Sequence, residues 1–117
     1  MRRLFFAAVV VAQLVVLYWP REVSTGGVPY LDKAIHLSVF GTAVWAGARA
    51  GLPLRLVVPA FLLHAPVSEL VQHYLLPGRD GDVFDALADC VGVACGAGVA
   101  IFTGLGAGRF RAVTDPG

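Results

Sequence analysis

The sequence predicts an all-α membrane protein whose four transmembrane helices form an up-down antiparallel arrangement with short loops. Hydrophobic residues make up 57% of the 117 residues and charged residues only 15%, whereas soluble domains usually carry about 25% charged residues. The mean hydropathy is +0.74. Four apolar stretches fill most of the chain, and its length leaves room for one domain, residues 1–117.

The first helix is expected at about residues 4–19. Arg2 and Arg3 precede an apolar run that only Gln13 interrupts. A secretory signal peptide is the alternative interpretation, but no small-x-small cleavage pattern directly follows the run. The run ends in an aromatic pair and a proline at residues 18–20, which is typical of a helix anchored at the membrane interface.

The second helix is expected at about residues 33–51, opened by Asp32, and the third at about residues 55–76. A loop rich in Ser, Thr and Gly precedes the second helix, and a tight Gly-Leu-Pro turn separates the two. Pro59 and Pro66 lie inside the third helix. We expect both to kink it, which membrane helices tolerate when neighbouring groups satisfy the freed carbonyls.

The fourth helix is expected at about residues 82–105, with Asp82 as its N-cap residue after a Pro-Gly turn. Gly92 and Gly96 form a G-x-x-x-G pair that favours close packing against another helix. At 100° per residue, the two glycines lie within about an 80° sector that also contains three aspartates. These aspartates are Asp82, Asp85 and Asp89.

The distribution of basic residues predicts the orientation of this bundle. Six arginines fall at one predicted end: Arg2, Arg3, Arg49, Arg55, Arg109 and Arg111. Three basic residues fall at the other: Arg21, Lys33 and Arg79. Because cytoplasmic segments carry the excess of Lys and Arg, both termini are expected in the cytoplasm.

Polar residues from three helices and one turn then meet at the extracytoplasmic end. Glu69 and Asp89 each lie about 10 Å below the end of their helix at 1.5 Å per residue, so they can reach the same depth. Ionisable residues inside a membrane are costly and usually functional. We expect Glu69 to pair with His36, Arg79 or both, and the alternative is a purely structural clamp. The candidate ligand-binding residues are Asp32, Lys33, His36, Glu69, Gln72, Arg79, Asp85 and Asp89.

Other site classes receive no support from the sequence. Cys90 and Cys95 are five residues apart in one helix, on different faces, so no disulfide joins them. No Cys/His spacing resembles a zinc site. Carboxylates and His36 could hold a divalent ion, but the spacing supplies no ligand geometry, so no metal or other cofactor is predicted. The net charge of +1 and the lack of a basic run indicate no nucleic-acid partner.

Together these motifs resemble the VanZ-like family of small bacterial integral membrane proteins. The ordered set comprises D-K-x-x-H from Asp32, E-x-x-Q from Glu69, P-G-R ending at Arg79 and D-x-x-x-D-x-x-G from Asp85. It spans most of the chain. The family commonly has Asn where this chain has Asp89. The resemblance implies a multi-pass protein of the bacterial inner membrane. The family's namesake is associated with low-level resistance to teicoplanin-type antibiotics, and no reaction is established for the family.

We therefore expect a cell-envelope protein whose polar site binds a head group. Candidate ligands are a cell-wall precursor, a membrane lipid or a glycopeptide-type antibiotic. One alternative is a non-catalytic interaction or assembly subunit that has other membrane protein subunits as partners. A second alternative is a membrane-embedded hydrolase or transferase, with Glu69 or Asp85 as general base and His36 as its partner. No Ser or Cys nucleophile motif accompanies these residues, so a binding role is expected ahead of an enzymatic one.

Overall fold

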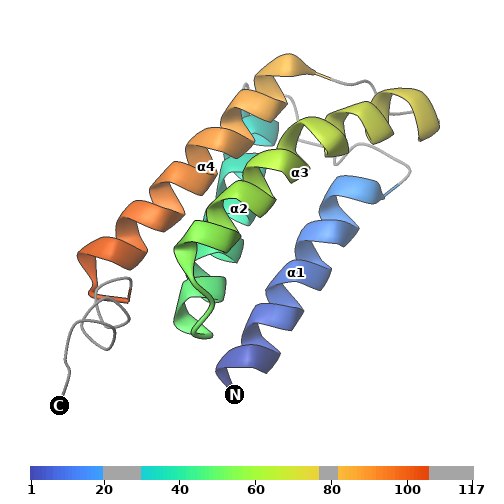
Figure 1. The fold of residues 1–117 in the computed structure, drawn as a ribbon. Coiled ribbons are helices and arrows are strands. Elements are labelled where there is room, and N and C mark those ends of the chain that lie inside the picture. The colour runs from blue at the N-terminus through green and yellow to red at the C-terminus, as the bar shows by residue number, and fades with distance from the viewer. Residues whose placement is uncertain (20–29, 77–81, 106–117) are drawn as a thin grey trace, which may run out of the picture.

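The computed structural model describes residues 1–19, 30–76 and 82–105. Within these ranges the chain forms four helices and no strand, which confirms the predicted all-α fold. The helices are α1 (Arg2–Tyr18), α2 (Leu31–Arg49), α3 (Leu54–Leu75) and α4 (Val83–Phe102) (Figure 1). Their ends differ from the predicted ranges by a few residues. The predicted turn between α3 and α4, most of the loop after α1 and the C-terminal tail lie outside the described residues.

The junction between α2 and α3 is a tight turn at Gly51, as predicted. Gly51 has a φ of 91°, a left-handed conformation that glycine adopts without steric cost. The Gly51 N–H donates to the Ala48 carbonyl, and the Leu52 N–H donates to the Gly47 carbonyl, each at a donor–acceptor distance of 3.0 Å. These two bonds form the Schellman pattern that ends many helices. Pro53 follows and precedes the first residue of α3.

The starts of α2 and α4 are capped differently. Asp82 Oδ1 accepts a hydrogen bond from the Phe84 N–H at 2.8 Å, which confirms Asp82 as the N-cap of α4. Helix α2 begins one residue before Asp32, which lies in its first turn, and Tyr30 is the N-cap residue. The Asp32 carboxylate accepts a hydrogen bond from Lys33 at 2.8 Å instead of capping the backbone.

Helices α2 and α4 form the most extensive helix pair, and their backbones touch along a glycine seam. We use this name for Gly41, Gly92 and Gly96. A Cβ atom on Gly92 would lie 2.3 Å from the Leu37 carbonyl oxygen, and one on Gly96 would lie 2.3 Å from the Gly41 carbonyl oxygen. The predicted close-packing role of Gly92 and Gly96 is therefore confirmed. Since Leu37 and Gly41 meet these glycines in the same order, α2 and α4 run in the same direction.

The hydrophobic core lies between the helices, further along α2 than the charged residues at its start. Phe40 is fully buried and meets the Phe61 ring edge-on at a centroid distance of 6.2 Å. Phe40 therefore joins α2 to α3. At the other end of α2, the Phe6 ring packs against Gly47, which brings α1 against α2. The buried hydrophobic cluster consists of Leu17, Phe40, Val44, Val57, Ala65 and Val93.

Two of the four helices, α3 and α4, are long and apolar enough to cross a membrane. Only 22% of the apolar window in α3 and 33% of that in α4 is buried inside the protein. Large hydrophobic side chains such as Leu56, Leu63 and Leu70 are instead exposed. Helix α1 has 17 residues, and α2 includes the charged residues Asp32, Lys33 and Arg49. Length and composition therefore support spans at α3 and α4.

Candidate functional site

The charged residues at the starts of α2 and α4 meet around one ammonium group. Lys33 Nζ lies 2.8 Å from Asp32 Oδ2, 2.6 Å from Asp82 Oδ2 and 2.9 Å from Asp85 Oδ1. We call these four residues the lysine cluster. The hydrogen bond from Lys33 lowers the pKa of Asp82, and the Phe84 N–H lowers it further. Lys33 therefore ties the first turn of α2 to the N-terminus of α4.

A second group, which we call the histidine cluster, consists of His36, Glu69 and Asp89. The His36 Nδ1–H donates to Asp89 Oδ1 over 2.8 Å, and Nδ1 lies 3.9 Å from Glu69 Oε1. Asp85 lies between the two clusters, since its Oδ2 is 3.7 Å from His36 Nε2. His36 is 5% exposed, Glu69 7% and Asp89 0%. Residues from three helices thus form one buried polar group, as the sequence predicts.

Glu69 connects α3 to both other helices of the site. Its Oε2 accepts a hydrogen bond from the Asp82 backbone N–H at 2.9 Å, in addition to the approach of His36. The expected pairing of Glu69 with His36 is therefore present at ion-pair distance. Arg79, the other expected partner, lies outside the described residues. Within them, Glu69 Oε1 and Asp89 Oδ2 are buried and accept no hydrogen bond.

Gln72 is buried on α3 but bonds to α1 and not to the clusters. Its Nε2–H donates to the Leu17 carbonyl over 2.6 Å. His64 is hydrogen-bonded to the Tyr18 hydroxyl at 2.9 Å, which joins α3 to α1. His73 is exposed.

Gln13 is a buried polar residue to which the sequence analysis assigned no role. It is 1% exposed, and neither its Oε1 nor its Nε2 has a hydrogen-bond partner among the described residues. Its signal in the sequence was its position as the single polar residue of an apolar run. A buried amide without a partner is destabilising, so Gln13 is a position where function or stability can be tested.

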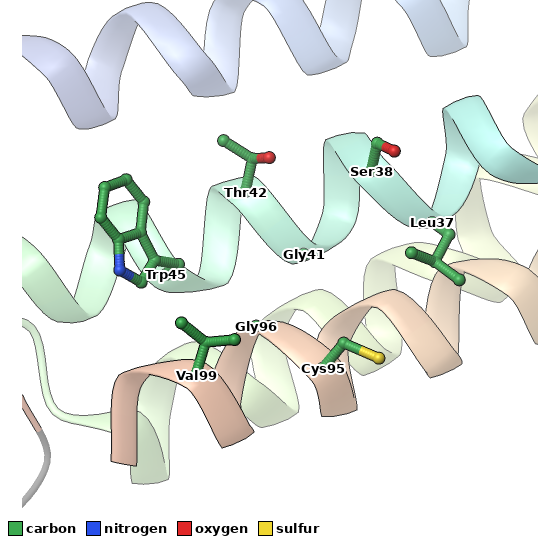
Figure 2. A pocket seen from close by; sticks show the side chains of 8 residues that line it. All are labelled: Leu37, Ser38, Gly41, Thr42, Trp45, Cys95, Gly96 and Val99. Carbon is green, nitrogen blue, oxygen red and sulfur yellow. The ribbon is translucent and has the colours of Figure 1, made fainter. Parts of the chain in front are cut away.

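A separate apolar groove of about 290 Å³ lies along the contact between α2 and α4. Figure 2 shows Trp45 and Val99 towards one end of it and Leu37 towards the other. None of the residues of the lysine and histidine clusters lines it. The lining residues are Leu37, Ser38, Gly41, Thr42, Trp45, Cys95, Gly96 and Val99.

No family model matches this chain, and no curated protein or solved structure is significantly similar to it. The likeness to the VanZ-like family therefore depends on the motif residues alone and stays a prediction.

The two clusters together are strongly acidic. Five carboxylates face one ammonium group and one imidazole among the described residues. Such a site attracts cations and can donate or accept protons through the His36 ring, which contacts a carboxylate near each nitrogen. The arrangement therefore combines hydrogen-bond acceptors, a titratable imidazole and one partly exposed ammonium group at one end of the helix bundle.

Proposed function

We propose that this chain is a multi-pass protein of the bacterial inner membrane whose lysine and histidine clusters bind a polar head group at the extracytoplasmic face. In this proposal all four helices cross the membrane in an up-down antiparallel arrangement, and both termini lie in the cytoplasm. The observation that carries the proposal is the convergence of buried ionisable residues from α2, α3 and α4 at one end of a highly apolar chain.

The apolar surface of the protein supports the membrane setting. In water, exposed leucines and valines along the length of α3 and α4 would form a large unfavourable surface, whereas hydrocarbon solvates them.

The contacts between α2 and α3 fit antiparallel neighbours. His36 approaches Glu69 at the start of α2, whereas Phe40, further along α2, meets Phe61, which precedes Glu69 on α3.

The positions of the arginines support the proposed orientation. Arg49 is at the end of α2 opposite the clusters, and it lies near the Phe5 and Trp45 rings. Arg2 and Arg3 at the start of α1 therefore belong to the same end of the bundle. This end corresponds to the cytoplasmic side under the positive-inside rule, which leaves the clusters facing outwards.

The accessible rim of the site fits a head group better than a whole buried molecule. The Lys33 side chain is 26% exposed, that of Asp82 37% and that of Asp32 47%, whereas that of Asp89 is fully buried. Hydroxyl and amine groups of a ligand can donate to the carboxylates, and a phosphate can accept from Lys33. The ligands that fit are a lipid, a lipid-linked cell-wall precursor or a glycopeptide-type antibiotic.

The test is mass spectrometry of the tagged protein purified from bacterial membranes in mild detergent. We expect a stoichiometric lipid or lipid-linked precursor that Glu69→Gln loses and His73→Gln retains, since His73 is exposed on the same helix. Circular dichroism checks that both variants fold. Equal ligand retention by the two variants, or a wild-type protein without any ligand, would contradict the proposal.

A second candidate is an assembly subunit in which the polar residues only hold helices together. The observation that favours it is the contact of Lys33 with three carboxylates, which is a sufficient clamp between α2 and α4. This candidate predicts a stoichiometric protein partner in the same mass spectra. It also predicts that Glu69→Gln alters the unfolding temperature without altering the bound lipid.

A further inference from the structure

The two clusters contain the same number of candidate ligand groups but differ in their cations. Asp32, Asp82 and Asp85 could together hold a metal ion, as could His36, Glu69 and Asp89. In the lysine cluster, the Lys33 ammonium group already lies within 2.9 Å of all three carboxylates. The histidine cluster contains no ammonium or guanidinium group among the described residues, although it is the more deeply buried of the two.

Three buried carboxylate oxygens of the site have no hydrogen bond within the described residues: Asp85 Oδ1, Glu69 Oε1 and Asp89 Oδ2. Asp85 Oδ1 lies 2.9 Å from the Lys33 ammonium group, and the other two oxygens belong to the histidine cluster. The side chain of Glu69 is 9% exposed and that of Asp89 is 0% exposed. Buried carboxylates are normally paired or bound to a metal. These two oxygens therefore mark a place in the fold where a bound cation would compensate buried negative charge.

We propose that His36, Glu69 and Asp89 bind one divalent transition-metal ion of the Zn²⁺ type. Their ligand atoms lie within 4.8 Å of one another. Ligand atoms about 2 Å from a tetrahedral zinc ion are separated by roughly 3–3.5 Å, so small side-chain rotations bring the three together. Three protein ligands leave a fourth position open, as in zinc sites that bind water or a ligand.

The proton balance of binding follows from the present hydrogen bond. Zinc binding through His36 Nδ1 displaces the proton that Nδ1 donates to Asp89 Oδ1. When the ring is doubly protonated, this proton is released to solvent, and Nε2, which lies 3.7 Å from Asp85 Oδ2, keeps its own proton. Metal-bound histidines commonly donate their second N–H to a carboxylate, which orients the ring, and Asp85 supplies the carboxylate near this nitrogen. Asp85 is therefore the positioning residue of the site.

The choice of ligands selects the class of metal. Ca²⁺ takes six to eight oxygen ligands and Mg²⁺ keeps several waters, whereas an imidazole with two carboxylates suits Zn²⁺ and its first-row neighbours. The histidine cluster is part of the proposed head-group site, so this inference rests on the proposed function. The open fourth position of the zinc ion can take one oxygen of a phosphate-bearing head group, which narrows the proposed ligands to that class.

The test titrates ZnCl₂ into the full-length protein in detergent after treatment with EDTA, by isothermal titration calorimetry. We expect one ion per chain, proton release and at least tenfold weaker binding in Asp89→Asn and in Glu69→Gln. The controls His73→Gln and Cys95→Ser should bind as the wild type does, and MgCl₂ should not compete. Failure of the wild type to bind stoichiometrically, or unchanged affinity in both carboxylate variants, would overturn the inference.

X-ray absorption spectroscopy of the zinc-loaded wild type decides the ligand set even if a variant does not fold. The expected spectrum contains one imidazole and otherwise oxygen ligands, and a sulfur shell would refute the assignment. Mass spectrometry of lipids before and after EDTA separates the two proposals. Lipid retained by a protein that binds no zinc contradicts only the metal site, and zinc bound by a protein without lipid contradicts only the head-group function.

Discussion

Asp89 is the residue that places the strongest electrostatic demand on the structure. Its side chain is fully buried on α4, and one of its two oxygens is bonded to His36. Taking an ionised carboxylate out of water is unfavourable unless another group compensates for the lost hydration. His36 supplies that compensation in the structure, so the two residues act as a unit. Removal of one leaves the other buried without its hydrogen-bond partner.

Asp89→Leu should therefore destabilise the protein by about 3–5 kcal/mol, since it removes the hydrogen-bonded carboxylate from the buried His36 ring. Asp89→Asn should cost clearly less, because its side-chain oxygen can still accept from Nδ1–H. Thermal unfolding in one detergent, followed by circular dichroism, measures both. Equal losses would show that the negative charge and not the hydrogen bond matters. Intact stability in Asp89→Leu would remove His36 and Asp89 from any joint role.

Gln13 leads to the opposite expectation. Because neither polar atom of this buried side chain has a partner among the described residues, Gln13→Leu should raise stability by about 1–2 kcal/mol. The measurement is the same unfolding experiment, and Leu14→Ala on the exposed face of α1 serves as a control with a small effect. A lower unfolding temperature in Gln13→Leu would mean that the amide bonds to a group supplied by a ligand or a partner.

Among the helices, the α2–α4 pair is the least tolerant of added volume. Gly92→Ala would bring a methyl group within 2.3 Å of the Leu37 carbonyl, so the backbones must separate. We expect a loss of roughly 1–3 kcal/mol, typical of overpacking. Gly98→Ala on the same helix is the matched control, since its Cβ would meet nothing within 4 Å. It should be neutral or gain up to about 1 kcal/mol from helix propensity.

Unfolding temperatures of the two alanine variants, measured side by side, check this prediction. Similar values would indicate that the seam is looser than the close approach of Gly92 to Leu37 requires. The effect should also extend to the site, because separated backbones draw His36 away from Asp89. A bound zinc ion therefore gives an independent readout, and Gly92→Ala should weaken zinc binding while Gly98→Ala leaves it unchanged.

The sequence predicts elements well here because apolar runs, caps and turn residues are local signals. The Gly-Leu-Pro turn, the Asp82 cap and the Gly92–Gly96 pair could all be read from neighbouring residues. Side-chain contacts between helices are harder to predict from the sequence, because they depend on the rotation of each helix about its axis and on its shift along that axis. Gln72 shares a face with Glu69 in the sequence yet bonds to the Leu17 carbonyl. Lys33 could equally have extended towards solvent, and the start of α4 supplies two of its three carboxylate contacts.

At the scale of the whole molecule, the proposed topology places the clusters and the chain termini on opposite sides of the membrane. Green fluorescent protein fused to the C-terminus should fluoresce, and alkaline phosphatase at the same point should be inactive. Alkaline phosphatase fused after Leu76, at the end of α3, should be active because it requires export. These two reporters measure orientation independently of any ligand. The reverse pattern of activity would contradict the proposed orientation of the site, but it would not affect the two clusters or their contacts.

The glycine seam has a mechanical consequence for the site. Since α2 and α4 touch through their backbones, we expect them to move together as one rigid unit. This unit holds Lys33, His36 and Asp89 in fixed positions relative to one another. Glu69 lies on α3, and its side chain accepts a hydrogen bond from the Asp82 N–H at the start of α4. We therefore expect ligand entry to move α3 relative to the α2–α4 pair and to break the hydrogen bond between Glu69 and the Asp82 N–H.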